Sequence, residues 1–284
     1  MIKEWLDAYK PANKEEAFNA LREIMQEVAL AGLQRAGFFE KAAFYGGTAL
    51  RIFYGLGRFS EDLDFSLLEV TPGFSLDKYL EAVRLEFESL GMKVSIQEKK
   101  KVNKSNIESA FLKSETIWKE LIIEKIIPQS GLLEKATIKI KIEVDTKPPL
   151  GFETEEKLLL KPFSFYVKCL TLPDLFAGKM HALLFRNWKK NVKGRDWYDM
   201  EWYIKKGVSL HLHHFLLWAQ DSGDWPHSTI TENELRKLLK EKIDTVDMNR
   251  VKADIIRFIP TPKAVDIWSA KYFHDVASHL KIAT

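Results

Sequence analysis

Two carboxylates, Asp62 and Asp64, are separated by a single leucine in a segment that alternates polar and apolar side chains. The alternation predicts a strand over residues 62–68, and residues two apart on a strand point to the same face. Neighbouring carboxylates repel each other and are costly to bury without a cation. Mg²⁺ prefers oxygen ligands and phosphates. The pair is therefore a candidate Mg²⁺ site, and an exposed strand with a polar face is the alternative.

A second motif, Gly46-Gly47-Thr48, lies between a short apolar strand and a predicted helix over residues 48–54. Glycines let the backbone approach a ligand closely, and the free N–H groups at a helix start bind anions. Thr48 adds a hydroxyl, and Arg51 follows one turn later as a further candidate phosphate contact. A tight turn without a ligand is the alternative. A strand returning to Asp62 would bring a bound phosphate close to a metal on the aspartates.

A third carboxylate is offered by the strand predicted over residues 137–145, where Ile and Val positions alternate with charged ones. Glu143 lies on the charged face and is a candidate metal ligand and general base, which would deprotonate an incoming hydroxyl. Two metal ions would stabilise the attacking and the leaving oxygen. Asp145 shares this face as a weaker candidate. Lys139 and Lys141 also point that way, so a solvated charged face is an equal alternative.

The elements that must position these residues form a mixed α/β pattern up to about residue 170. Long helices are expected over residues 13–36 and 76–90, and alternating segments near 93–102 and 107–118. From residue 174 onward the pattern is helical. We therefore expect an α+β fold, in which residues 1–170 form a mixed sheet with flanking helices and residues 171–284 form an all-helical domain.

The composition excludes several classes of protein. The 284 residues are 46% hydrophobic and carry a formal net charge of +3, which does not indicate a general nucleic-acid binder. The single cysteine, Cys169, excludes an intramolecular disulfide and is expected to be a buried thiol in a reducing compartment. No apolar run is long enough to span a bilayer, and the first residues lack an apolar signal core. We expect a cytoplasmic protein without a membrane partner.

Four ordered blocks of the sequence resemble the AbiEii/AbiGii toxin family, whose members are nucleotidyltransferase-like toxins of toxin–antitoxin and abortive-infection systems. The fold that such enzymes share is that of the polymerase-β-like nucleotidyltransferases. One departure is the turn, because related transferases often have Ser where this chain has Thr48. The blocks are Tyr45–Arg51, Arg58–Phe65, Ile140–Val144, and Lys179–Arg186 followed by Gly194–Met200.

The resemblance implies a nucleoside triphosphate substrate, Mg²⁺ as cofactor (two ions, with Mn²⁺ as a substitute), and an RNA, such as tRNA, or a protein as acceptor. A separately encoded antitoxin is also implied. Lys179 would contact the nucleotide phosphates and Asp196 would complete the site. The residues alone leave other roles open, since Asp196 could cap the helix starting at Trp197 and Asp199 is a rival for its role.

Two other functions use the same residues. The first is a transferase that modifies a small molecule such as an antibiotic, and the second is a nucleotide-binding module that has lost catalysis. A basic and aromatic patch near residues 188–197 is a candidate guide for an RNA acceptor, with a solvated loop as the alternative. The three histidines at 211, 213 and 214 are interpreted as an ordinary helix start, because their spacing does not suit a single metal ion.

Overall fold

A computed structural model describes residues 1–97, 116–124, 137–186 and 192–283 of the chain. Its elements fall into two compact units. Unit 1 comprises residues 1–55, 59–148 and 154–169, and unit 2 comprises residues 56–58, 149–153 and 170–284. The domain boundary predicted at residue 170 stays a prediction, and each unit draws on more than one stretch of the chain.

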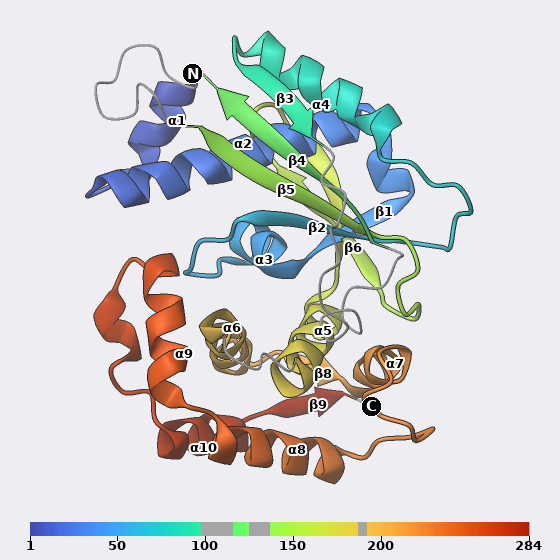
Figure 1. The fold of residues 1–284 in the computed structure, drawn as a ribbon, viewed down its shortest axis with the longest axis vertical. Helices are drawn as coiled ribbons and strands as arrows, with labels where there is room; N and C mark the ends of the chain where they lie inside the picture. Colours follow the sequence, from blue (N-terminus) through green and yellow to red (C-terminus); the bar gives the residue numbers. More distant parts are fainter. Residues whose placement is uncertain (98–115, 125–136, 187–191, 284) are drawn as a thin grey trace. The chain divides into compact units, whose positions relative to one another are not determined.

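Unit 1 is built on a seven-stranded mixed sheet with the strand order β3-β4-β5-β2-β1-β7-β6. Strand β2 pairs antiparallel with β1 and parallel with β5, and β3, β4 and β5 form an antiparallel meander. Figure 1 shows this sheet with its helices. The strands are β1 (Ala42–Tyr45), β2 (Asp62–Leu67), β3 (Lys93–Gln97), β4 (Thr116–Glu124), β5 (Ile138–Asp145), β6 (Thr154–Leu159) and β7 (Phe165–Leu170), and the helices are α1 (Ile2–Tyr9), α2 (Lys14–Arg35), α3 (Gly46–Tyr54) and α4 (Asp77–Ser89).

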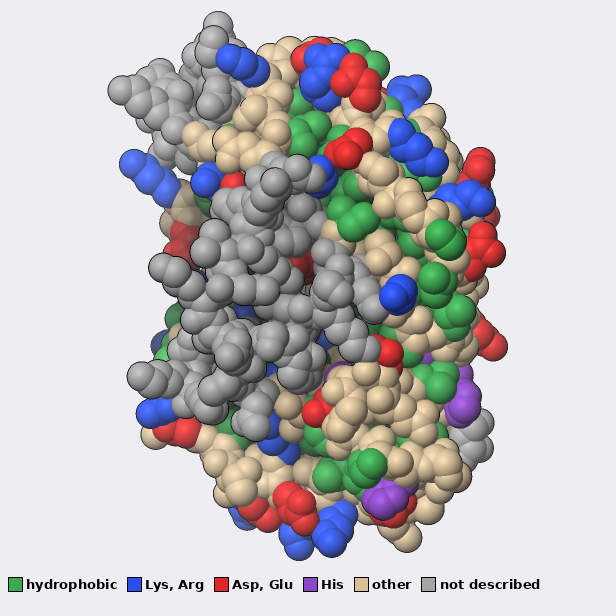
Figure 2. Space-filling view, turned by 45° about the vertical axis from the view of Figure 1, so that its right-hand side comes forward, with side chains coloured by type: hydrophobic (Ala, Val, Ile, Leu, Met, Phe, Trp, Pro, Cys, Tyr) green, Lys and Arg blue, Asp and Glu red, His purple; other side chains and the backbone are tan. Residues whose placement is uncertain are grey.

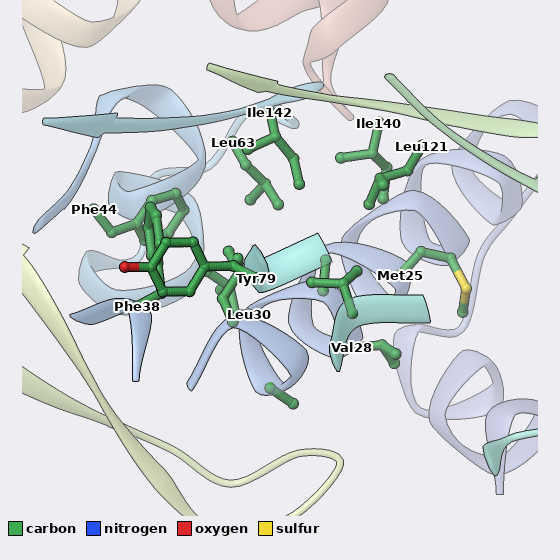
Figure 3. Close-up of a cluster of buried hydrophobic side chains, with 14 of the residues drawn as sticks. Met25, Val28, Leu30, Phe38, Phe44, Leu63, Tyr79, Leu121, Ile140 and Ile142 are labelled. Atoms are coloured by element: carbon green, nitrogen blue, oxygen red, sulfur yellow. The ribbon is translucent and has the colours of Figure 1, made fainter. Parts of the chain in front are cut away.

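Helix α2 begins where the sequence predicted, because the side chain of Asn13 accepts a hydrogen bond from the backbone N–H of Glu16 at 2.9 Å. Its apolar face packs with that of α4 against one face of the sheet. Figure 3 shows Met25 and Val28 of α2 in the same cluster of buried side chains as Leu63 of β2 and Ile142 of β5. All four side chains are buried. This core occupies one face of β2 and β5 and leaves the other face to their polar residues.

Unit 2 is mainly helical. It also contains a two-stranded parallel sheet, β8-β9, which the expectation of an all-helical domain did not include. Each strand has three residues, too few to produce a recognisable alternation. The elements are α5 (Leu172–Phe185), α6 (Gly194–Lys205), β8 (Ser209–His211), α7 (Leu212–Asp221), α8 (Glu232–Thr245), α9 (Met248–Ile255), α10 (Ala270–Ser278) and β9 (Lys281–Ala283).

The α+β fold class expected from the sequence is confirmed. The strand expected over 107–118 differs, since residues 107–115 lie outside the described part of the chain and β4 extends to Glu124. Cys169 is a buried free thiol, and burial raises its pKa. In the described part of the chain, no helix is both long and apolar enough to cross a membrane. Acidic and basic side chains are interspersed over the face in Figure 2, as the small net charge implies.

Candidate active site

The candidate metal ligands of unit 1 lie on two adjacent strands. Parallel pairing of β2 with β5 sets Asp64 opposite Glu143. Leu63 and Ile142, the neighbours of these residues in the chain, are fully buried on the core face, so the three carboxylates occupy the opposite face. Asp62 and Asp64 are half-buried, and the Glu143 side chain is 24% exposed. The register therefore groups three oxygen-donor side chains on one face of the sheet.

The glycine turn lies directly against this group. Gly46 is the first residue of α3 and has a φ of 82°, a conformation that favours glycine. A Cβ added at Gly46 would overlap the Oδ2 atom of Asp64. Tyr45, which precedes the turn, is opposite Asp64 in the pairing of β1 with β2. The absence of a side chain at Gly46 therefore allows the Asp64 carboxylate to lie against the helix start.

Thr48 links the turn to the second strand. Its buried hydroxyl donates a hydrogen bond to the backbone carbonyl of Asp62 at 2.5 Å. A hydroxyl has one proton to donate, so in this arrangement the proton serves the backbone of β2. The phosphate contact expected of Thr48 stays a prediction. The hydrogen bond that the structure does show joins the start of α3 to β2.

Arg51, one helical turn after Thr48 in α3, is held by contacts to α2 and to the loop before β2. Its Nε donates to Glu23 of α2 at 2.8 Å, and its guanidinium lies 4.5 Å from the centre of the Phe59 ring. The interaction with Phe59 is of the cation–π type. These contacts give Arg51 a bracing position between α2 and the loop before β2, and the phosphate contact expected of it stays a prediction.

A lysine adjoins the carboxylates. Lys141 is opposite Asp62 in the pairing of β2 with β5, and its Nζ forms an ion pair with Glu143. The sequence had placed both residues on the charged face without pairing them. The ammonium offsets the negative charge gathered there, as a metal ion would. Glu143 would have to leave this ion pair to serve as a ligand or base.

The donor set fits Mg²⁺ in its chemistry, since carboxylates are the oxygen ligands this ion prefers. Asp62, Asp64 and Glu143 would hold it. Among the described residues, no three His, Cys, Asp or Glu side chains converge closely enough to form a ready metal site. Figure 1 locates these residues on β2 and β5, next to the start of α3.

Unit 2 contains a buried ion-pair network that the sequence did not reveal. Arg58, 1% exposed, donates from Nε and Nη2 to the two carboxylate oxygens of Asp199 at 2.6 and 2.7 Å. Lys179 Nζ lies 2.9 Å from Asp199 and 3.9 Å from Asp196. Burial alone would raise the pKa of Asp199, but the two cations outweigh it and hold the pKa below its ordinary value.

Asp196 and Asp199, the two candidates for the same role, have different positions in this network. Asp199 is completely buried and compensates Arg58 and Lys179, which is a structural arrangement. Asp196 lies in the first turn of α6 and is 6% exposed. The nucleotide-binding role of Lys179 and the catalytic role of Asp196 stay predictions. The signal that could have found the Arg58–Asp199 pair is the presence of both residues within the blocks of the family resemblance.

The remaining sequence candidates have ordinary partners. His211 precedes α7 and its Nδ1 lies 2.5 Å from Asp174, while the Nε2 of His214 accepts a hydrogen bond from Trp218 at 3.0 Å. These contacts fit the interpretation of the histidines as a helix start. The basic and aromatic patch lies partly outside the described residues, which exclude 187–191. Arg195, a described member, lies 4.3 Å from the centre of the Phe258 ring.

The site in unit 1 defines a class. A glycine turn at a helix start, next to three carboxylates on one face of a mixed sheet, is compatible with the transfer of phosphate-linked groups. Residues 28–274 match the family described as "Nucleotidyl transferase AbiEii toxin, Type IV TA system". The chain therefore belongs to this family of nucleotidyltransferase toxins of toxin–antitoxin systems.

Similar chains occur among solved structures. MenT4, a nucleotidyltransferase toxin from Mycobacterium tuberculosis, is similar over 98% of this chain and 87% of its own, with a TM-score of 0.54 and 17% identity. A candidate nucleotidyltransferase from H. pylori is 17% identical over 89% of this chain and 91% of its own, with a TM-score of 0.49. JHP933 from Helicobacter pylori is 18% identical over 89% and 88%, with a TM-score of 0.46. No curated protein matched the chain.

Proposed function

We propose that this chain transfers a nucleoside monophosphate from a nucleoside triphosphate to a hydroxyl of an RNA, with tRNA as the acceptor class, and that this reaction is the basis of its toxicity. The observation that carries the proposal is the register of β2 with β5, which sets Asp64 opposite Glu143 and beside the Gly46 turn. The turn would bind the phosphates, and the carboxylates would hold the ions that neutralise them.

Each residue has a part that follows from its position. The first backbone N–H groups of α3, with Gly46 and Gly47 free of side chains, would bind phosphate oxygens. Asp62, Asp64 and Glu143 would hold Mg²⁺, which when bound polarises the phosphate and stabilises the leaving oxygens. Glu143 would accept the proton of the attacking hydroxyl once released from Lys141. Pyrophosphate leaves as the new phosphodiester bond forms.

Lys179 and Asp196 belong to the proposal through the family signature. Lys179 is 20% exposed and would offer a cationic Nζ to the triphosphate. Asp196 is the other acidic residue of the same signature, and its Oδ1 lies 3.9 Å from Lys179 Nζ. A change of Lys179 to Met would test this role and also remove one of the two cations that compensate Asp199. Its effect on activity must therefore be measured together with its effect on stability.

The test uses the full chain, Mg²⁺, each of the four α-labelled NTPs, and either total RNA or a protein extract. We expect label in tRNA with wild type, loss of labelling with EDTA, and loss with Asp64→Asn. The control is Glu69→Gln, an exposed carboxylate just past the end of β2. If wild type labels nothing and Asp64→Asn remains as toxic as wild type, the proposed function is wrong. Label in protein alone would replace RNA as the acceptor, and modification of aminoglycosides alone would favour a small-molecule transferase.

A further inference from the structure

A pocket in unit 2 adjoins Asp196, to which the proposed function gives a role, and is otherwise lined by residues that the proposed function does not use. Its volume is about 270 Å³, and it is lined by residues of α5, α6, α8 and α9 and of the segments that flank these helices. All of these residues belong to the same unit. Figure 1 shows α9 next to α6 within this unit. The pocket can therefore be examined independently of the carboxylates on β2 and β5.

The pocket is basic. Among the described residues that line it, four cationic side chains stand against two carboxylates, a surplus of two positive charges. One carboxylate, Asp247, accepts hydrogen bonds from the backbone N–H groups of Asn249 and Arg250 at the start of α9. It also lies 3.2 Å from Nε of Arg250, an exposed ion pair that an incoming anion would compete with. The other is Asp196. The four cations are Arg186, Lys193, Lys242 and Arg250.

Two of these cations are held at an energetic cost. Burial lowers the pKa of Lys242, and burial together with Arg195 and Arg186 lowers the pKa of Lys193. Lys242 is fixed by a hydrogen bond from Nζ to the carbonyl of Leu184 at 3.0 Å. Like charges gathered in a half-buried place repel each other, and an anion placed among them relieves that repulsion. An anionic ligand is therefore the natural occupant.

The remaining lining indicates what kind of anion. Part of the wall is apolar and is formed by Ala182, Leu183, Val192, Val246 and the buried Trp197. An inorganic anion needs only the cations, whereas a nucleotide has an anionic phosphate and a less polar sugar and base. The mixed lining matches the second kind of ligand, and guanidinium groups such as those of Arg186 and Arg250 pair well with phosphate oxygens.

We infer that this pocket binds the phosphate group of a nucleotide, in addition to the phosphate-binding turn at Gly46. The inference rests on the proposed function for the choice of nucleotide. The phosphate belongs either to the backbone of the RNA acceptor or to the nucleoside triphosphate. The phosphates of both sources have the same chemistry, so the two are told apart by measuring the binding of an RNA and of NTP analogues separately.

The test measures binding without turnover. Wild-type protein is titrated with a fluorescent short single-stranded RNA, and separately with α,β-methylene analogues of the four NTPs. The variant is Arg250→Gln, because Arg250 is 64% exposed and its removal leaves the core intact. Arg250→Lys keeps the charge. The matched control is Lys240→Gln, an exposed lysine of α8 that does not line the pocket.

We expect Arg250→Gln to weaken one of the two ligands about tenfold, Arg250→Lys to restore most of the affinity, and Lys240→Gln to have no effect. If RNA is the ligand, the slope of log K against log salt falls by about 0.7 in magnitude. If only the NTP analogues are weakened, the triphosphate is the source. Equal affinities for wild type and Arg250→Gln, or equal losses in Lys240→Gln, overturn the inference. Wild type that binds but transfers nothing contradicts the proposed function and leaves the pocket supported.

Discussion

Replacing Gly46 by Ala is expected to lower the transfer activity strongly, while the free energy of unfolding falls only by the cost of the strained backbone. Gly46 has a φ of 82°, and a Cβ there would overlap Asp64 Oδ2, so the carboxylate must move. The backbone strain costs about 1–2 kcal/mol for an L-residue with a side chain. Displacing a catalytic group by about 1 Å costs roughly 10²-fold in rate. We therefore expect a loss of about 10²-fold in transfer of label to RNA.

Gly55 provides the matched control, since it ends the same helix with a φ of 80° and an added Cβ would meet nothing within 4 Å. Gly55→Ala thus carries the same strain without touching a carboxylate. Both variants are compared by urea unfolding and by the labelling rate with Mg²⁺. Similar unfolding free energies with a rate loss confined to Gly46→Ala support the reasoning. Equal rates in two folded variants would refute the claim that Gly46 makes room for Asp64.

Three further predictions concern buried charges. Burial and Glu23 raise the pKa of Glu27 to about 7, so the stability that the protonated Glu27 contributes is fully present below pH 4.5 and is lost as the pH rises through 7. The free energy of unfolding of Glu27→Gln should exceed that of wild type by up to about 3 kcal/mol at pH 8 and equal it at pH 4. Urea unfolding that shows no gain at pH 8 would contradict this. Burial lowers the pKa of His214 to about 4, so the free energy of unfolding of wild type should fall by up to about 3 kcal/mol as the pH falls from 6.5 to 4. The melting temperature of His214→Gln should decrease less than that of wild type over the same pH range. Asp199→Asn removes the charge of a carboxylate that accepts hydrogen bonds from the buried Arg58 guanidinium and should cost about 3–5 kcal/mol. An unfolding midpoint within error of wild type would show that the pair is dispensable.

Local chemistry made part of this site predictable. The alternation in residues 137–145 predicted that Glu143 faces away from the core, and the structure shows Ile142 and Val144 buried on the core face. The two motifs around Gly46 and Asp62 were predicted to meet because a short helix returns the chain to the next strand. These inferences needed only side-chain periodicity and glycine stereochemistry.

Long-range pairing made the rest unpredictable. The register that sets Asp64 opposite Glu143 depends on the whole sheet, and no local pattern encodes it. The hydrogen bond from Thr48 to the carbonyl of Asp62 competes with the role expected of its hydroxyl, and only a structure shows which acceptor it takes. The basic pocket is similar, because Lys193, just before α6, and Lys242 of α8 are far apart in the chain and the packing of the helices brings them together.

The Arg58–Asp199 pair has a consequence for the synthesis of the chain. The two residues are 141 positions apart, so at about 5–20 residues per second a ribosome makes Asp199 roughly 7 to 28 seconds after Arg58. During this interval Asp199, whose carboxylate pairs with the buried Arg58 guanidinium in the folded unit 2, has not yet been made. Unit 2 therefore cannot be completed by its own late segment alone. A fragment that starts after residue 170 would lack Arg58 and would leave Asp199 with Lys179 as its remaining ion-pair partner in that unit.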